Sequence, residues 1–441
     1  MSPRPASPRE TVVGGRRPLQ GRLRVPGCKG MSHRALLIAA VAEGTSRITH
    51  LAPGGDVRRT RRALELLGVK TRRFGTYEAG DEALDVFGDG FDGLLEPPSV
   101  IGCGNSATTA RMLLGLLGGR SFLAVLTGDR SLVQRPMTRV VQPLRALGAW
   151  IDGRDNASLL PLTIRGGPLR GARIELGVAS GQVKTALVLA GLQATGTTEI
   201  VEPGPSRDHT ERMLRSLGAP VEVVDDRTVR VRAGVPKPFE LDVPGDPSSA
   251  AFFLVGAAIT PGSDLVIEDL LLNPGRIAFL DVLERMGAAV RVEPAGERLG
   301  EPYGDVGVRS GPLTGTVVDC QEAIIDEVPA LAVAAAFAEG VTEFRGAAEM
   351  RVKETDRIAT LEAELTKLGV GVESVSDGLV VRGGAPGAAS LTSHGDHRIA
   401  LAAAIAGNAI DGETTVEGFS AAAVSYPDFL NDLDRLTGRS G

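Results

Sequence analysis

Short polar motifs that carry lysine or arginine recur along the chain, each at the start of an apolar segment. PGCKGMSHR contains Lys29 and Arg34, SATTAR ends in Arg111, SGQVK ends in Lys184, and HGDHR ends in Arg398. Their Ser, Thr, Asn and Asp residues are good N-caps, and a capped helix N-terminus is a ready anion site. The helix dipole disfavours a cation there by about 0.3 to 1 kcal/mol. The repetition therefore suggests bound anions, although each single cation could instead point into water.

Two further motifs offer groups for proton transfer. IIDEVP places Asp326 and Glu327 just ahead of an apolar helix expected over residues 330–338. A carboxylate there can be an N-cap or a general base, and the local pattern favours neither. RVKETDRI places Lys353 and Arg357 four residues apart, so on a helix both would reach one face and hold Glu354 between them. The alternative is a solvated run of charge.

Lysine is rare here: only six of the 48 basic residues are Lys. An ammonium can shift its pKa and take part in proton transfer, whereas guanidinium stays charged. Lys29 and Lys353 thus occupy positions that Arg could not fill. Lys184 could simply cover its helix with its alkyl stem.

Two more motifs, RPMTR (135–139) and SRDHTE (206–211), add arginine clamps. No zinc spacing links the dispersed histidines, which are His33, His50, His209, His394 and His397. Phosphate-loop, dinucleotide and nucleophile-elbow motifs are also lacking. We expect no metal and no cofactor. Chemistry then depends on Lys, Arg, Asp, Glu and backbone amides, which suits substrates with two or more anionic groups.

Composition limits the protein class. The chain has 441 residues, 43% hydrophobic and 23% charged, a balance typical of globular proteins. A net charge of −6 with 4% aromatic residues argues against nucleic-acid binding. Three cysteines far apart in sequence disfavour disulfides and structural zinc. The head, residues 1–15, has no apolar segment, and no later run is long enough for a membrane helix. We expect a soluble, cytoplasmic protein that uses no membrane.

One sequence pattern occurs six times: an Ala/Leu-rich helix, a glycine and then a strand rich in β-branched residues. The copies begin at residues 33, 109, 183, 249, 330 and 397. About thirty residues later comes a second, amphipathic helix, which in five copies ends in a Leu/Met-Gly signature such as ELLGV or ERMGA. Glycine after the last apolar turn is a helix C-cap, and alternating strand residues follow it. The sixth copy, NDLDRLTG, is degenerate.

Such a helix buries its face only against neighbouring copies, so six modules predict few domains. We expect an α/β fold with two lobes of three repeats. Lobe one comprises residues 1–26 plus 247–441, and lobe two comprises residues 27–246. Turn residues at Pro26–Gly27 and in VPGDP (243–247) mark the crossings. The active site is expected in the cleft between the lobes.

The motifs resemble those of the 5-enolpyruvylshikimate-3-phosphate synthase family of enolpyruvyl transferases. The resemblance runs from about residue 18 to residue 430 and is carried, in the family's order, by PGCKGMSHRALL, GNSATTARMLL, GDRSLVQRPMTR, ASGQVKTAL, SRDHTERML, GDPSSAAFF, IDEVPALAV, RVKETDRI, GDHRIALA and VSYPDF. It implies a two-lobed inverse α/β barrel of six βαβαββ repeats, three per lobe.

The resemblance also implies the reaction. The enolpyruvyl group of phosphoenolpyruvate passes to the 5-hydroxyl of shikimate 3-phosphate and phosphate leaves, without metal or cofactor, in the shikimate pathway to chorismate and the aromatic amino acids. The implied catalytic residues are Lys29, Asp326 and Glu354. Shikimate 3-phosphate would contact Lys29, Gly30, Arg34, Ser180, Gly181, Gln182, Ser206, Arg207, Asp326 and Lys353. Phosphoenolpyruvate would contact Lys29, Ala107, Arg135, Gln182, Arg357 and Arg398. A monomer is expected.

Four positions depart from the common family pattern. Cys28 replaces an Asp, and Gly30 replaces a Ser whose hydroxyl would meet the shikimate phosphate. That change removes a hydrogen bond worth about 1.5 to 3 kcal/mol to a charged group. Ala107 stands where many members have Gly, and its methyl would crowd glyphosate, so we expect a glyphosate-tolerant enzyme. Val424 lies where some members have a substrate-facing Lys.

Two other interpretations stay open. A related enolpyruvyl transferase acts on UDP-N-acetylglucosamine, but its usual Cys is absent from GDRSLVQRP. A noncatalytic anion-binding repeat protein, or a repeat relative acting on RNA ends, would share the architecture. Turnover with each acceptor separates these possibilities.

Overall fold

The structure, a computed structural model, describes residues 11–74, 82–320 and 323–438. Residues 1–10 lie outside the described residues. They make up most of the N-terminal segment, residues 1–15, in which the sequence shows no apolar run. The chain divides into two compact units. Unit 1 comprises residues 1–26, 245–296 and 302–441, and unit 2 comprises residues 27–244 and 297–301. The inclusion of residues 297–301 in unit 2 is a feature that the sequence pattern did not indicate.

Unit 2 contains three repeats of helix, strand, helix and two strands. The first has α1 (Lys29–Val41), β3 (Glu43–Leu51), α2 (Gly55–Leu66), β4 (Lys70–Arg73) and β5 (Glu82–Asp89). The second has β6 (Ile101–Gly102), α3 (Ala107–Leu117), β7 (Leu123–Thr127), α4 (Thr138–Ala146), β8 (Trp150–Gly153), the short α5 (Arg154–Ala157) and β9 (Leu162–Arg165). The third has β10 (Arg173–Glu175), α6 (Gly181–Gly191), β11 (Thr197–Val201), α7 (His209–Ser216), β12 (Val221–Val223) and β13 (Thr228–Arg232).

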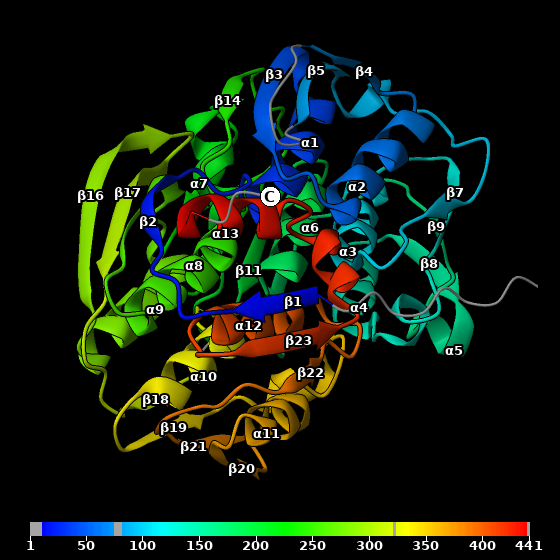
Figure 1. Cartoon of the computed structure of the whole chain (residues 1–441). Coiled ribbons are helices and arrows are strands. Elements are labelled where there is room, and N and C mark those ends of the chain that lie inside the picture. Colours follow the sequence, from blue (N-terminus) through cyan, green and yellow to red (C-terminus); the bar gives the residue numbers. More distant parts are fainter. Residues whose placement is uncertain (1–10, 75–81, 321–322, 439–441) are drawn as a thin grey trace, which may run out of the picture. The chain divides into compact units, whose positions relative to one another are not determined.

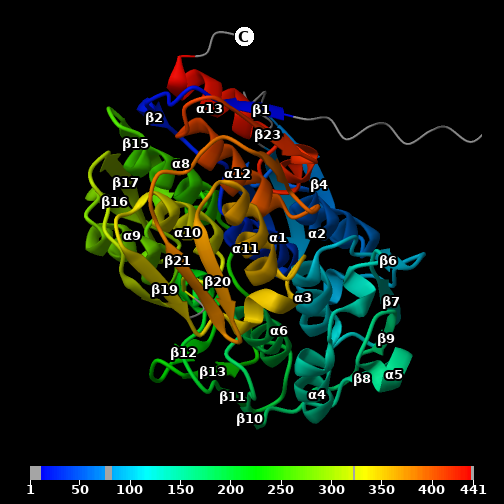
Figure 2. The same ribbon diagram turned by 60° about the horizontal axis from the view of Figure 1, so that its bottom comes forward.

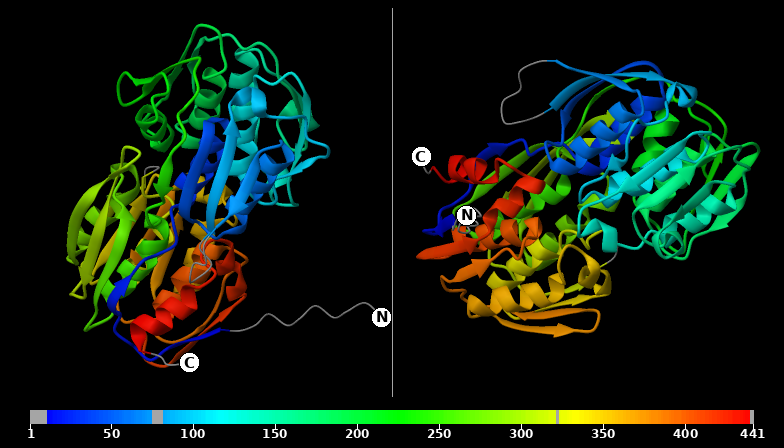
Figure 3. Two further views of the ribbon diagram at one scale, coloured as in Figure 1. Left: turned by 90° about the horizontal axis from the view of Figure 1, so that it is seen from above. Right: turned by 90° about the vertical axis from the view of Figure 1, so that its right-hand side faces the viewer.

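Unit 1 has the same order in its first two repeats. It has α8 (Pro247–Ile259), β15 (Asp264–Leu271), α9 (Pro274–Met286), β16 (Ala289–Arg298) and β17 (Glu301–Arg309), the two strands of the long hairpin in Figure 3. Next come β18 (Val317–Asp319), α10 (Val328–Phe337), β19 (Val341–Arg345), α11 (Arg357–Lys367), β20 (Gly371–Val375) and β21 (Gly378–Arg382). The last repeat has β22 (Ser390–Thr392), α12 (His397–Asn408), β23 (Glu413–Glu417) and α13 (Phe429–Thr437).

Each repeat forms its own small mixed sheet. In the second repeat the order is β6-β7-β9-β8, with β6 parallel to β7 and the other pairs antiparallel. In two sheets the first strand comes from elsewhere in the chain: β14 (Glu240–Asp242) pairs with β3, and β2 (Gln20–Leu23) pairs with β15. β1 (Thr11–Gly14) replaces the outer strands of the last sheet by pairing with β23. The βαβαββ repeat expected from the sequence is confirmed in five copies, while the sixth, degenerate copy has β1 in place of its last two strands.

The first helix of every repeat is buried. All residues of α8 are buried, and so are Met31 to Val41 of α1. Apolar residues on all sides mark a helix enclosed by neighbours. In unit 1, α8, α10 and α12 pack against one another (Figure 1), while in unit 2 α3 packs against α6. The second helices are amphipathic; α11, for example, lies against β20 and β21 (Figure 2).

Five glycines end the second helices as predicted. Gly68, Gly148, Gly218, Gly287 and Gly369 have φ angles of 87°, 110°, 75°, 104° and 82°. This left-handed conformation strains any residue with a Cβ, which explains the Leu/Met-Gly signature.

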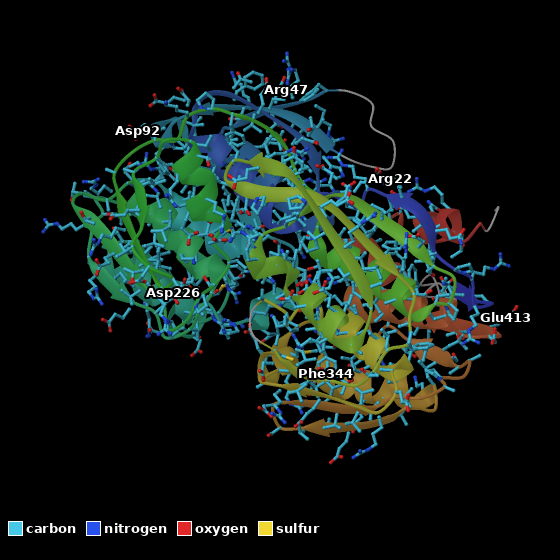
Figure 4. The ribbon with its side chains drawn as sticks, turned by 90° about the vertical axis from the view of Figure 1, so that its left-hand side faces the viewer. Arg22, Arg47, Asp92, Asp226, Phe344 and Glu413 are labelled. Carbon is cyan, nitrogen blue, oxygen red and sulfur yellow. The ribbon has the colours of Figure 1, made fainter. Side chains whose placement is uncertain are left out.

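Ion pairs join neighbouring strands of the sheets. Arg22 on β2 binds Glu268 and Asp305, and Arg47 on β3 binds Asp85 on β5. Figure 4 labels the two arginines. Within the described residues, we find no helix both long and apolar enough to cross a membrane.

Candidate active site

In unit 2, Lys29 is the first residue of α1, and its ammonium lies 3.4 Å from Asp56 Oδ2 at the start of α2. The preceding Cys28 occupies the N-cap position without a side-chain cap hydrogen bond. Asp246 and Asp396 occupy the matching positions before α8 and α12, and both accept a backbone N–H. Ser106 caps α3 in the same way, so Cys28 removes from α1 a cap that the sequence retains in three other repeats.

Arg34 lies inside unit 2, with 3% of its surface exposed. Its guanidinium donates to the carbonyls of Gly30 and Gly181 and to the hydroxyls of Thr185 and Thr210. Burial lowers the pKa of Arg34 to about 10, so it stays charged at neutral pH. Arg34 thus ties together the two glycine-bearing helix starts, α1 and α6, and it does not point into water.

Gln182, in the first turn of α6, is held from both ends of its amide. Arg111 Nη1 donates to its oxygen over 2.8 Å, and its nitrogen donates to Thr108 Oγ1 over 3.0 Å. Ala107 begins α3 and is buried. These contacts place Gln182, Arg111 and Ala107 at the facing N-termini of α3 and α6.

Arg135 follows the turn before α4. Its Nη2 donates to Asn105 Oδ1 over 2.8 Å, and Asn105 Nδ2 donates to Asp129 Oδ2 over 2.8 Å. Because Asn105 lies just before α3, this chain of bonds holds Arg135 close to the start of that helix.

Ser180 and Ser206 are joined by a buried carboxylate that sequence reasoning did not single out. Glu202 accepts the backbone N–H of Ser180 over 3.1 Å and the hydroxyl of Ser206 over 2.9 Å. Lys184 Nζ lies 2.8 Å from Glu202 and 2.8 Å from Glu211. The interpretation of Lys184 as an alkyl cover over its helix is wrong, because its buried ammonium is paired with two buried carboxylates.

A chain of hydrogen bonds links α1, which begins at Lys29, to α2 and α3. His33 Nδ1 lies 2.7 Å from Thr60 Oγ1, which lies 2.7 Å from Thr109 Oγ1, and Thr109 in turn donates to the cap residue Ser106. Burial lowers the pKa of His33 to about 3. The imidazole is therefore neutral at physiological pH.

One group of the described residues has the composition of a metal site. Potential ligand atoms of Asp208, His209 and Glu301 lie within 4.8 Å of one another. His209 Nδ1 lies 2.7 Å from Glu301 Oε1, so a hydrogen bond accounts for the contact between those two buried residues.

In unit 1, Asp326 is surrounded by three cations. Its carboxylate lies 4.0 Å from Lys353 Nζ, 3.9 Å from Arg357 Nη1 and 3.7 Å from Arg398 Nη2. Arg398 also donates to the Asp326 carbonyl over 2.6 Å. Glu327, rather than Asp326, holds the N-cap position of α10, and it makes no side-chain cap bond. Asp326 is thus the centre of a charge cluster, and the capping alternative is wrong for both carboxylates.

Lys353 and Arg357 do not share a helix. A 3-10 turn covers Ala348–Val352, and α11 begins at Arg357 with Asp356 as its cap. The expected shared helix face is therefore wrong. Both side chains approach Asp326 from different elements: Lys353 follows the 3-10 turn, and Arg357 begins α11. Glu354 binds Arg357 Nη2 over 2.6 Å, so the interpretation of this segment as a merely solvated charge run is also wrong.

A second buried network supports the cluster. Arg276 Nη2 donates to Ser248 Oγ over 2.7 Å and to Asp246 over 3.2 Å, while Ser248 donates to Glu327. Arg398 Nη2 lies 3.5 Å from the same Ser248 oxygen. Arg398 is therefore held between the start of α8 and the start of α10.

Each unit on its own presents cations and helix N-termini at the predicted motifs. Three of the cations in or beside the first turns, Arg34, Lys184 and Arg398, are buried, which excludes the alternative that they point into water. Such groups stabilise negative charge strongly where water is excluded.

The sequence matches a known family over nearly its whole length. The family model described as EPSP synthase (3-phosphoshikimate 1-carboxyvinyltransferase) covers residues 13–433. The chain belongs to the EPSP synthase family.

Relatives agree with this assignment. A 3-phosphoshikimate 1-carboxyvinyltransferase of Synechococcus sp. (strain JA-3-3Ab) is 48% identical over 427 residues, which cover 95% of each chain. One from Herpetosiphon aurantiacus is 47% identical and covers 96% of this chain and 97% of its own. The crystal-structure relative EPSP synthase of Acinetobacter baumannii has a TM-score of 0.87 and 38% identity, covering 97% of this chain and 98% of its own.

A more distant neighbour shows how far the fold extends. The enolpyruvyl transferase NikO of Streptomyces tendae has a TM-score of 0.78 at 20% identity and covers 98% of both chains. The EPSP synthase fold, two units of three βαβαββ repeats, is thus shared beyond close relatives.

Several residues that hold the EPSP synthase motifs in place escaped the sequence analysis. Asp56 faces Lys29, Asn105 holds Arg135, Glu202 joins two serines, and Asp396 pairs with Arg357. Asp56 and Asp396 follow a glycine at a helix start, a signal that could have marked them. Glu202 follows a strand and carries no such signal.

Proposed function

We propose that this chain transfers the enolpyruvyl group of phosphoenolpyruvate to the 5-hydroxyl of shikimate 3-phosphate. The products are 5-enolpyruvylshikimate 3-phosphate and phosphate, in the pathway to chorismate and the aromatic amino acids. Membership of the EPSP synthase family over residues 13–433 is the observation that carries this function.

We assign shikimate 3-phosphate to charged and polar residues of both units. In unit 2, the phosphate would be held by Ser180, Ser206, Arg207 and the backbone of Gly30, with Arg34 holding the glycine loops in place. The remaining assigned residues are Lys29, Gly181, Gln182, Asp326 and Lys353. The hydrogen bonds from Arg34 to the Gly30 and Gly181 carbonyls support this assignment, because they hold the N-termini of α1 and α6, which are potential anion sites.

Phosphoenolpyruvate is assigned to a second set of cations. Its carboxylate and phosphate would contact Arg357 and Arg398 of unit 1 and Lys29, Ala107, Arg135 and Gln182 of unit 2. The proposal therefore requires residues of both units to hold the same pair of substrates. Fixed arginines suit two anionic groups because guanidinium binds oxyanions in a bidentate manner.

Proton transfer is assigned to Lys29, Asp326 and Glu354. A proton would go to C3 of phosphoenolpyruvate while the 5-hydroxyl, losing its own proton to a carboxylate, attacks C2. The tetrahedral intermediate then loses a C3 proton as its C–O bond to phosphate breaks. Asp326 lies within 4.0 Å of three cations, and a carboxylate can accept the proton of the hydroxyl. The same cations would stabilise the anionic intermediate.

The direct test measures phosphate release by the purified chain supplied with phosphoenolpyruvate and either shikimate 3-phosphate or UDP-N-acetylglucosamine. We expect phosphate release when the acceptor is shikimate 3-phosphate and none when it is UDP-N-acetylglucosamine. Release with only the other acceptor, or none from folded protein, would refute the function.

A Glu354→Gln variant separates an enzyme from an anion-binding protein. We expect calorimetry to show that shikimate 3-phosphate still binds, while turnover falls by about 10² to 10⁴, the range of one general acid or base. Wild-type turnover in the variant would remove Glu354 from the proposed mechanism.

We also propose that the enzyme is a monomer that works in the cytoplasm. The three cysteines are buried and unbridged, which fits a reducing compartment. Light scattering on the purified chain gives the mass in solution; a dimer mass would overturn the monomer, and cell fractionation tests the location.

A further inference from the structure

Glu202 connects two segments that the proposed function assigns to one phosphate group. It follows β11 directly and is 3% exposed. Its Oε1 accepts the Ser180 backbone N–H, at the start of α6, and its Oε2 accepts the Ser206 hydroxyl, ahead of α7. One buried carboxylate therefore fixes both serine-bearing segments, although they are far apart in sequence.

Lys184 completes this arrangement. Its ammonium lies 2.8 Å from Glu202 Oε2, 2.8 Å from Glu211 Oε1 and 3.5 Å from the Ser206 carbonyl oxygen. Burial works against the charge, yet the two carboxylates raise the pKa of Lys184 above its ordinary value. The cation thus remains available to Glu202 in a buried site.

We propose that Glu202 is a positioning residue for shikimate 3-phosphate, holding the Ser180 and Ser206 segments in the arrangement that receives its phosphate. This inference rests on the proposed function, which assigns both serines to that phosphate. Glu202 itself touches no substrate; it acts through the two serines.

The available hydrogen-bond donors indicate a second role for Glu202, which is to release the Ser206 hydroxyl to the phosphate. Ser206 has one hydroxyl hydrogen, which it donates to Glu202. A phosphate dianion only accepts hydrogen bonds, so Ser206 must turn that hydrogen from Glu202 to the ligand. Glu202 Oε2 then keeps the Lys184 ammonium as its partner. The exchange replaces one charge-assisted bond by another and leaves no buried carboxylate oxygen unpaired.

Glu211 provides a matched control. It is buried to the same extent as Glu202 and binds the same ammonium over the same distance. Among the described residues it makes no hydrogen bond to either serine, and its Oε2 has no hydrogen-bond partner. A role limited to neutralising Lys184 would make the two glutamates equivalent.

The experiment compares Glu202→Gln with Glu211→Gln in the full-length enzyme. A glutamine at position 202 that keeps its oxygen towards the Ser180 N–H turns its NH₂ group towards the Ser206 hydroxyl, which can accept a hydrogen bond, and towards the Lys184 ammonium, which cannot and so loses this carboxylate partner. We expect the KM for shikimate 3-phosphate to rise about 10- to 100-fold, the value of one hydrogen bond to a charged group. The KM for phosphoenolpyruvate should move by less than about twofold, and Glu211→Gln should stay within about twofold of wild type in all constants.

Glu202→Gln is also made in a Ser206→Ala background. Its effect on the KM would be the same in the two proteins if the role of Glu202 were purely structural. If Glu202 acts through Ser206, Glu202→Gln should cost less on that background than on wild type. An equal rise in the KM for shikimate 3-phosphate in both glutamine variants, or a rise in neither, overturns the proposal. If Glu202→Gln does not fold, Glu202→Asp is compared with Glu211→Asp by the same criterion.

The outcome is separate from that of the proposed function. Wild-type enzyme that fails to release phosphate refutes the function, whereas active wild-type enzyme with indistinguishable variants refutes only the role of Glu202.

Discussion

The guanidinium of Arg357 and the carboxylate of Asp396 form a buried ion pair. Nε lies 2.7 Å from Oδ2 and Nη2 lies 3.2 Å from Oδ1. Asp396 also accepts the backbone N–H of Arg398 over 2.8 Å as the cap of α12. One carboxylate therefore fixes Arg357 and the start of the helix that carries Arg398. Both arginines are assigned to phosphoenolpyruvate.

Asp396→Asn should damage both stability and substrate binding. It keeps a cap acceptor but leaves the buried Arg357 charge without this partner, at a cost of about 3 to 5 kcal/mol. We expect the urea midpoint to fall and the KM for phosphoenolpyruvate to rise at least about tenfold, with the KM for shikimate 3-phosphate less affected. An unchanged urea midpoint would contradict the importance of this pair.

Gly30→Ser should strengthen the binding of shikimate 3-phosphate. A Cβ built on Gly30 would meet Arg34 Nη1 at 3.6 Å, His209 Cδ2 at 3.7 Å and Cys28 Sγ at 3.8 Å, which are ordinary contacts. The new hydroxyl can donate to the phosphate, so the dissociation constant measured by calorimetry should fall about tenfold. Gly30→Ala, which adds the methyl without the hydroxyl, is the control, and an equal gain in both variants would exclude the hydrogen bond.

Ala107→Gly should make the enzyme more sensitive to glyphosate. The Ala107 methyl is expected to crowd this inhibitor beside the phosphoenolpyruvate site, and overpacking by one methyl costs about 1 to 3 kcal/mol. The inhibition constant should therefore fall about tenfold or more in steady-state assays. A wild-type constant as low as that of sensitive enzymes, or no change in the variant, would show that Ala107 is not the cause.

His33 should make the fold less stable in acid. Its pKa is about 3 in the folded chain because burial disfavours the charged ring, whereas an unfolded His has a pKa of about 6.5. Between these values the unfolded state binds the extra proton, so the free energy of unfolding rises with pH. The contribution is complete above about pH 6.5 and is lost towards pH 3, at up to about 1.4 kcal/mol per pH unit.

The measurement is urea unfolding from pH 7 to pH 4 for wild type and His33→Asn. Asparagine can keep the bond to Thr60 but does not titrate, so the variant should lose less stability on acidification. The charged neighbours of His33, Asp56, Lys29 and Arg34, are the same in both proteins. Equal slopes for the two proteins would mean that another group causes the acid sensitivity.

The residues near each helix start were predictable because their signals are local. Gly68 and Gly369 mark helix ends through backbone strain that any Cβ would feel. The apolar faces of α8 and α10 identify buried helices through their composition alone. The repeat pattern therefore specified the βαβαββ modules without any knowledge of contacts.

Pairings across the chain were not predictable in this way. Lys184 looked like an exposed or alkyl-covering cation, and only folding brings it against Glu202 and Glu211. Lys353 and Arg357 reach Asp326 from a bend and from the first residue of α11 rather than along one helix face.

The sequence by itself determined the six modules, the family and the residue types at each helix start, because these depend on local backbone preferences and motif order. The tertiary structure alone decided which charges are paired with one another within the protein. Burial and Coulomb energy depend on distances between side chains that lie far apart along the chain, as Glu202 and Asp396 show.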